Sequence, residues 1–138
     1  MPLDSKRLRQ IAGRAPVRPV ARGEVYIVDQ TKLWLPAEPG ELQQKPRRVV
    51  VMQGNIASVC RGVELVLVAP TSATLPPGPY DYEPPDGELE DGFTESATIF
   101  VSQVQPCPKS LLVRREGTVS NQCQHNLINL LLRLMGTL

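Results

Sequence analysis

Short runs of β-forming residues, separated by loops rich in proline and glycine, are the feature that most constrains how this chain folds. The first run, residues 25–28, follows the turn residue Gly23. Residues 49–52 are continuously apolar, which predicts a central strand buried on both faces. Residues 63–69 are expected to form the next strand, which runs into Pro70. These runs predict a small, mostly antiparallel sheet.

The stretch after this sheet core is less regular. Residues 74–92 are dense in proline, glycine and acidic residues, so they are predicted to form neither helix nor strand. Alternation of apolar and polar residues returns over residues 96–104, which predicts a strand that Pro106 and Pro108 stop. Residues 110–115 are expected to form a short strand or a helical turn.

The C-terminal segment carries the clearest helical signal. Ser120 is a suitable N-cap, and Gly136 fits the position just past the helix end. An apolar stripe at helical spacing consists of Cys123, Leu127, Leu130, Leu131 and Leu134. It is widened by Ile128, Leu132 and Met135. A helix with so broad an apolar face is expected either to be buried on two sides or to pack against a partner subunit.

The length of 138 residues indicates one folded domain. We assign residues 1–20 to a basic N-terminal arm, residues 21–138 to the domain, and residues 74–95 to an acidic loop within it. The net charge is only +1, so any affinity for nucleic acid must come from local patches. Aromatic residues make up 4% of the chain, which argues against a base-stacking platform.

The cysteines argue against a disulfide framework and against a metal site. Cys60, Cys107 and Cys123 are odd in number, widely spaced and without a paired Cys-x-x-Cys motif. We therefore expect a reduced, cytoplasmic protein that uses no metal or other cofactor. The longest apolar stretch, near the C-terminus, is too short and too interrupted to span a bilayer, so no membrane association is predicted.

Arginine is the remaining candidate for chemistry. His125 is the single histidine, which excludes a ribonuclease built on two histidines. Its place off the apolar stripe predicts that it lies on the surface of the helix. Arg47 and Arg48 stand at the entrance of the apolar strand, where one is expected to face the barrel interior or a groove and the other to face away. Guanidinium groups bind phosphate and stabilise extra phosphorane charge. The alternative is that both are solvated charges at a strand start.

Several pieces, in order along residues 21–136, resemble the MazF/PemK family of toxin endoribonucleases. They are Arg22-Gly23-Glu24 with the strand after it, Gly40-Glu41, Arg47 before Val49-Val50-Val51, Pro70-Thr71-Ser72, Ser102-Gln103-Val104, and the final helix. The resemblance implies an α+β fold, a small SH3-like antiparallel β-barrel with a C-terminal helix. It also implies a homodimer that cleaves single-stranded RNA without a metal and is paired with a cognate antitoxin.

The resemblance also implies roles for individual residues. Arg47 stands at the position of the family's catalytic arginine, and Ser72 at that of its catalytic threonine, with Thr71 beside it. In the family scheme a 2'-hydroxyl attacks the adjacent phosphate, which leaves a cyclic phosphate and a free 5'-hydroxyl. Contacts to RNA are predicted for Arg48, Trp34, Gln53 and Gln103. This chain departs from the family pattern in having Arg48 for proline, Ser72 for threonine and Ser102 for aspartate.

Two other functions remain open on the sequence. The altered motif is compatible with an SH3-like binding module that is catalytically impaired, and the same fold includes poisons of DNA gyrase. The carboxylates of the acidic loop would repel RNA, restrict which RNA sequences enter a groove, or occupy that groove themselves. The alternative is that the loop is a surface insertion. The basic arm would offset the repulsion of RNA by contacting phosphates.

Overall fold

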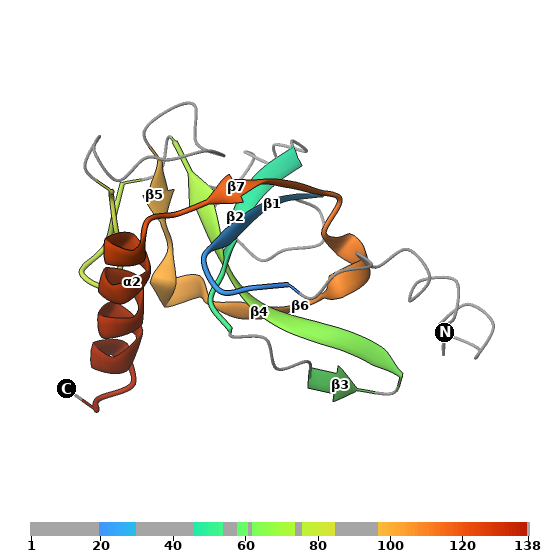
Figure 1. Cartoon of the computed structure of the whole chain (residues 1–138). Helices are drawn as coiled ribbons and strands as arrows, with labels where there is room; N and C mark the ends of the chain where they lie inside the picture. Colours follow the sequence, from blue (N-terminus) through green and yellow to red (C-terminus); the bar gives the residue numbers. More distant parts are fainter. Residues whose placement is uncertain are drawn as a thin grey trace, which may run out of the picture.

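The computed structural model describes residues 20–29, 46–53, 58–60, 62–73, 76–84 and 97–137 (Figure 1). Residues 1–19 of the predicted arm, Trp34 and most of the acidic loop lie outside these residues. The strands are β1 (Glu24–Asp29), β2 (Pro46–Val51), β3 (Ser58–Cys60), β4 (Val63–Ser72), β5 (Thr98–Ile99), β6 (Gln105–Pro108) and β7 (Arg114–Thr118). The helical elements are the 3-10 turns η3 (Val101–Gln103) and η4 (Lys109–Leu111) and the helix α2 (Asn121–Leu134).

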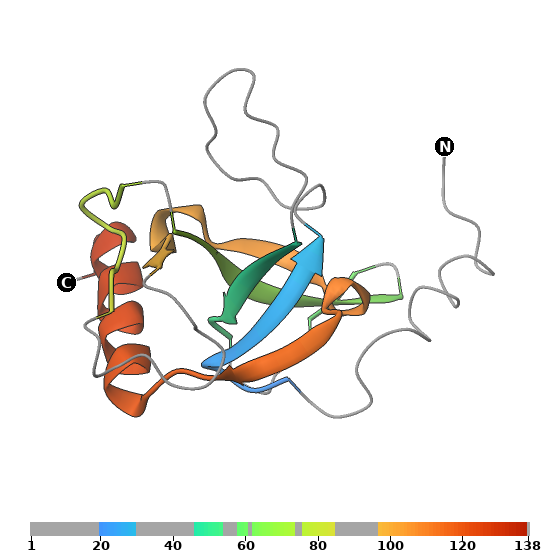
Figure 2. The same ribbon diagram turned by 90° about the horizontal axis from the view of Figure 1, so that it is seen from above.

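In the described part of the chain, the strands form one curled antiparallel sheet. Its main order is β3-β4-β2-β1-β7, and β5 and β6 pair with the other side of β4. Strand β2 lies between β1 and β4, which confirms the prediction of a central strand. Figures 1 and 2 show the sheet curling on itself, with α2 standing against one side. The predicted α+β fold, a small SH3-like barrel with a C-terminal helix, is confirmed.

Two apolar clusters occupy the two faces of the sheet. The first lies inside the curl and contains Val20, Tyr26, Val28, Val49, Val51, Val66, Val68, Cys107 and Leu112. The second lies between the sheet and α2 and contains Val25, Val50, Met52, Ala69, Ile99, Val101, Val119, Cys123 and Leu127. Successive residues of β1 and β2 alternate between the clusters, because strand side chains alternate between faces. This explains why residues 49–52 are continuously apolar.

The turn before β1 joins four elements at one glycine. Gly23 has φ of 90°, its N–H donates to the carbonyl of Val51 at 2.8 Å, and its carbonyl accepts from the N–H of Val119 at 2.9 Å. A Cβ atom at this position would collide with the side chain of Gln124 on α2. Only glycine meets both the backbone and the spatial requirement here. The turn therefore ties β1 to β2, to the chain after β7 and to the helix.

Glu24 follows this glycine and is buried, with 4% of its surface exposed. One carboxylate oxygen accepts from the N–H of Ala21 at 2.6 Å, and the other accepts from Nε of Arg115 on β7 at 2.6 Å. A buried carboxylate is tolerated only when it is paired and hydrogen-bonded in this way. This charge pair joins the start of β1 to β7 at the edge of the sheet.

The prediction that prolines end the strands is wrong. Pro70 lies inside β4, and Pro106 and Pro108 belong to β6, which pairs with β4 over residues 65–68. In an antiparallel ladder only alternate residues donate to a given neighbour, so prolines at alternate edge positions leave the ladder intact. Pro70 uses its carbonyl, which accepts from the N–H of Phe100 at 2.9 Å.

The predicted strand over residues 96–104 is also wrong in most of its length. Only Thr98 and Ile99 form a strand, and η3 follows directly. Ile99, Phe100 and Val101 are all buried, so the alternating pattern does not correspond to one buried face. The chain leaves the sheet here because it must pass from the end of β4 back to its middle. Residues 110–115 are predicted to form a short strand or a helical turn. They contain the end of the 3-10 turn η4 and the start of the strand β7.

The predicted C-terminal helix is confirmed, and so are its predicted N-cap and its terminal glycine. The hydroxyl of Ser120 accepts from the N–H of Cys123 at 3.0 Å, and Gly136 has φ of 81° just past the end. Cys123 and Leu127 are buried, whereas Leu134 and Met135 at the far end are exposed. His125 is exposed, as predicted. Among the described residues, no helix is long and apolar enough to cross a membrane.

Replacing Gly23 with alanine is expected to lower the free energy of unfolding by about 2 kcal/mol or more, because strain at positive φ adds to the collision with Gln124. Gly62→Ala is the matched control, since Gly62 has φ of 81° and open space around it. That variant should lose only about 1 kcal/mol. Urea denaturation followed by circular dichroism measures both losses, and equal losses would show that the contact with Gln124 is unimportant.

Cys107 is expected to resist alkylation. Burial raises the pKa of its thiol to about 11, so it stays protonated at pH 8 and becomes a thiolate only well above pH 9. Native protein treated with iodoacetamide at pH 8 should label Cys107 about 100-fold more slowly than an unfolded control in urea. Peptide mass spectrometry resolves this cysteine from the others. Equal labelling rates in the native and unfolded protein would contradict the burial.

Candidate active site

The strand register brings Arg47 and Ser72 to the same place. Val49 of β2 pairs with Pro70 of β4, so continuing this antiparallel register sets Arg48 opposite Thr71 and Arg47 opposite Ser72. The side-chain hydroxyl of Thr71 donates to the carbonyl of Arg48 at 2.8 Å, which supports this continuation. Residues that are directly opposite point to the same face of a sheet. Two positions separated by a long stretch of sequence therefore form a pair at the sheet end.

The two arginines face opposite sides of the sheet. Arg47 alternates with Val49 and Val51, which belong to the cluster inside the curl. Arg48 alternates with Val50, which belongs to the cluster beneath α2. Arg47 thus shares the interior face with Ser72, and Arg48 shares the helix-side face with Thr71.

Both arginines are partly buried and incompletely paired. The Nε atoms of Arg47 and Arg48 are buried and have no hydrogen-bond partner among the described residues. Burial also lowers the pKa of the Arg47 guanidinium, because desolvation disfavours its charge. A buried donor without an acceptor is unfavourable. An anion that enters this end of the sheet would supply the missing acceptor.

The two hydroxyl residues opposite the arginines lie on different faces of the sheet. Ser72 is buried, with 2% of its surface exposed, and it lies next to β5 through its pairing with Thr98. Thr71 is buried too, and the hydrogen of its hydroxyl is committed to the Arg48 carbonyl. Thr71 therefore holds the two strands together, whereas Ser72 shares the face of Arg47.

The other residues predicted to contact RNA are not shown close to Arg47 and Ser72. Gln53 lies beyond the opposite end of β2, about 20 Å from Arg47 along an extended strand, and its side chain accepts from the N–H of Leu67 at 3.2 Å. Gln103 ends η3, on the side of β4 away from β2. Trp34 lies outside the described residues. The proposed RNA contacts of these three residues stay predictions.

An aspartate that the sequence analysis did not single out lies against Ser102. The carboxylate of Asp81 accepts from the hydroxyl of Ser102 at 2.7 Å, from its N–H at 3.2 Å, and from the N–H of Gly78 at 2.9 Å. Ser102 stands where the resemblance expects an aspartate. The structure thus supplies a carboxylate at this point from another segment, which a linear motif cannot reveal. No group of three histidine, cysteine or acidic residues in the described ranges is arranged to hold a metal ion.

Fold and site together define a small curled barrel with one packed helix and an arginine–serine pair at a sheet end. The family of PemK-like, MazF-like toxins of type II toxin-antitoxin systems matches residues 21–135. The chain therefore belongs to this family, as its motifs predict. No curated protein is similar enough in sequence to match.

Solved structures of other proteins share this fold. A MazE-MazF complex from Deinococcus radiodurans aligns with a TM-score of 0.60 and 10% identity, covering 88% of this chain and 99% of that one. A mycobacterial endoribonuclease in complex with its cognate antitoxin aligns with a TM-score of 0.58 and 14% identity, covering 85% and 95%. The Mycobacterium tuberculosis toxin MazF-mt6 aligns with a TM-score of 0.57 and 18% identity, covering 86% and 97%.

The buried Nε of Arg47, which has no partner among the described residues, is expected to cost stability in the absence of an anion. Arg47→Met should raise the free energy of unfolding by up to about 1 kcal/mol, because it removes this unpaired donor and keeps the apolar stem. Arg114→Met is the control, since Arg114 is exposed and bonded to Glu116 at 2.9 Å, and it should give no gain. Urea denaturation at low ionic strength measures both. Added sulfate should stabilise the wild type more than Arg47→Met, and a stabilisation shared equally would contradict an anion site at Arg47.

Proposed function

We propose that this chain is a metal-independent endoribonuclease toxin that cleaves single-stranded RNA with some sequence selectivity. Membership of the toxin family supports this, and two of the structural neighbours are described as endoribonucleases. The observation that carries the proposal is the register of β2 and β4, which sets Arg47 and Ser72 on one face at the same end of the sheet. A cation and a hydroxyl so arranged suit a phosphodiester.

In the proposed reaction, the RNA itself supplies the nucleophile. The 2'-hydroxyl oxygen bonds to the adjacent phosphorus, and the bond from phosphorus to the 5'-oxygen breaks. The products are a 2',3'-cyclic phosphate and a free 5'-hydroxyl, and the proton lost from the 2'-hydroxyl is balanced by one gained at the 5'-oxygen. Arg47 stabilises the phosphorane charge and assists proton transfer. Ser72 donates to a phosphoryl oxygen.

Arg48 faces the other side of the sheet and is proposed to bind a neighbouring phosphate of the same strand. Trp34, Gln53 and Gln103 are proposed to add further contacts to the RNA. Thr71 contributes by holding β2 and β4 in register through its bond to the Arg48 carbonyl. These roles predict that substitution of Arg47 affects the chemical step more than substitution of Arg48.

The proposed partners are a cognate antitoxin and a second copy of this chain. Two of the neighbouring structures are complexes of toxin with antitoxin. The exposed apolar end of α2, with Leu134 and Met135, supports packing against a partner subunit. We place the active protein in the cytoplasm, where mRNA is its substrate.

The proposal is tested by incubating purified protein with a mixed-sequence RNA in EDTA. Products with cyclic-phosphate ends are expected, and Arg47→Ala should slow their formation by about 100-fold or more, because it removes a charge that stabilises the transition state. Ser72→Ala should slow it by about 10-fold or more, since one hydrogen bond to the phosphoryl oxygen is lost. Arg114→Ala is the control and should cleave at the wild-type rate.

A catalytically impaired binding module is the second candidate, and the deep burial of Ser72 favours it. It predicts RNA that is bound but stays intact across many sequences, with binding that does not change when Ser72 is replaced. Uncut RNA at high protein concentration, together with retained binding in a filter assay, would replace the endoribonuclease proposal with this one.

A further inference from the structure

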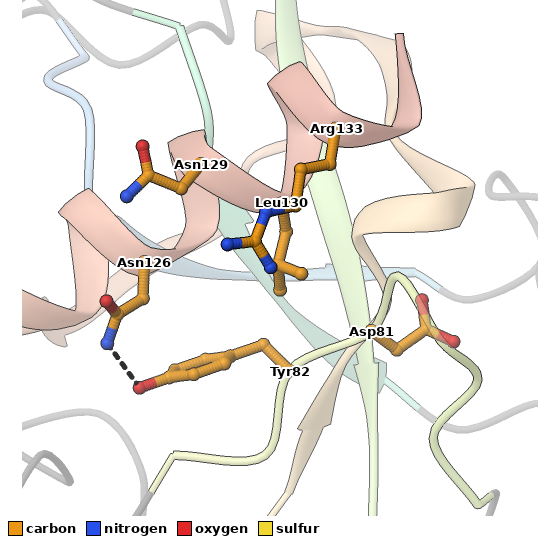
Figure 3. Close-up of a pocket in the computed structure, with 6 residues that line it drawn as sticks. All are labelled: Asp81, Tyr82, Asn126, Asn129, Leu130 and Arg133. Carbon is orange, nitrogen blue, oxygen red and sulfur yellow. Dashed lines mark hydrogen bonds between the residues drawn. The ribbon is translucent and has the colours of Figure 1, made fainter. Parts of the chain in front are cut away.

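A cavity of about 360 Å³ lies between α2 and the segment of residues 76–84, away from the arginine–serine pair. Its lining residues are Asp81, Tyr82, Asn126, Asn129, Leu130 and Arg133 (Figure 3). The volume is at the lower end of the range for sites that bind small ligands. None of these residues is used by the proposed cleavage reaction.

The frame of this cavity is held by hydrogen bonds. The amide nitrogen of Asn126 donates to the hydroxyl of Tyr82 at 2.8 Å, which joins the helix to the opposite wall. The backbone of Tyr82 pairs with Ile99, with N–H to O distances of 2.9 and 2.6 Å. Asp81 is held by Gly78 and Ser102, and Figure 3 shows its carboxylate turned away from the other lining side chains. The walls are therefore built before any ligand arrives.

The polar groups that remain for a ligand are those of Asn129 and Arg133. Neither side chain has a hydrogen bond or ion pair with any described residue, and Figure 3 shows the guanidinium of Arg133 over the space between the helix and Tyr82. Because the Asp81 carboxylate points away from the other lining side chains, the charged group that lies over this space is the Arg133 guanidinium. Arginine binds phosphate in a bidentate manner, and asparagine pairs with the edge of a base. The ring of Tyr82 offers a face for stacking.

The cavity lies on the same face of the sheet as Arg48, which is proposed to bind a neighbouring phosphate of the RNA. Arg48, Thr71, Ile99 and Tyr82 lie opposite one another on neighbouring strands, in one row across the sheet. Arg48 and Tyr82 are at the two ends of this row, three strand spacings or about 14 Å apart. A few nucleotides of single strand cover that distance. The row runs on the helix-side face, where Ile99 belongs to the second cluster and Tyr82 packs against it.

From the lining, the charge and the distance, we infer that this cavity is an accessory subsite for one nucleotide of single-stranded RNA. Arg133 binds the phosphate, Asn129 contacts the base edge, and Tyr82 stacks on the base. The inference rests on the proposed function for the identity of the ligand. It adds a determinant of sequence selectivity outside the cleaved dinucleotide, in residues that the sequence motifs do not include.

The direct test is a titration of the isotope-labelled protein with each of the four ribonucleoside 5'-monophosphates, followed by NMR. At least one nucleotide should shift the side-chain amide signals of Asn129 and the ring signals of Tyr82. Arg133→Gln should weaken that binding about tenfold. Arg114→Gln is the matched control on β7 and should bind as the wild type does. Parallel titrations with the corresponding nucleosides and with inorganic phosphate separate the base contact from the phosphate contact.

This binding test needs no cleavage, so it can succeed or fail independently of the endoribonuclease proposal. If no nucleotide shifts these signals at millimolar concentration, or if Arg133→Gln and Arg114→Gln bind equally, the subsite is overturned, whether or not RNA is cleaved. If RNA is cleaved, lengthening a minimal oligonucleotide should raise kcat/KM about tenfold in the wild type and much less in Arg133→Gln. A gain that is equal in both proteins would also overturn the inference. Shifts produced only by an acidic peptide, and by no nucleotide, would assign the cavity to a protein partner instead.

Discussion

The buried carboxylate of Glu24 is the interaction on which the rest of this structure depends. It bonds to the turn at Ala21 and to Arg115, so it closes β1 against β7 at a point where Gly23 also joins β2 and the helix. A charge so deeply buried requires hydrogen-bonded and charged partners, and removing Arg115 would take away its ion-pair partner. The glycine and glutamate of the Arg22-Gly23-Glu24 motif thus have an architectural role, and the residues proposed for the chemistry lie elsewhere.

The strand register connects the position of β1 to the geometry of the candidate site. Once β1 is fixed, its pairing with β2 sets Val28 opposite Arg47, and the pairing of β2 with β4 sets Ser72 on the same face. The register also decides which of two adjacent arginines faces the interior, because a shift of one residue would exchange their faces. The apolar residues of β2 oppose such a shift, since it would exchange the memberships of the two clusters. Apolar packing therefore orients the polar site.

The sequence predicted the elements whose signals are local and failed where long-range pairing decides. The helix from Asn121 was predictable because its cap, its apolar stripe and its terminal glycine lie in one segment. The strand role of Pro106 and Pro108 was not, since it depends on β4 offering an edge to which only alternate residues must donate. For the same reason Arg47 and Ser72 were found as motif positions, but their common face required the register. Tyr82 and Asn126 gave no signal, because each acquires a partner only in the folded chain.

The contacts of Asp81 show how a change in the family motif is compatible with the same architecture. Where the motif expects an aspartate, the hydroxyl and the N–H of Ser102 both donate to the carboxylate of Asp81, which lies in the loop after β4. The segment that carries Asp81 also carries Tyr82, and it is bonded to β5 and to α2. The loop is thereby fastened between the sheet end and the helix, where it forms one wall of the cavity. The carboxylate beside Ser102 and this wall of the cavity thus come from one segment, which lies far from residue 102 in the sequence, so the motif around residue 102 gives no sign of either.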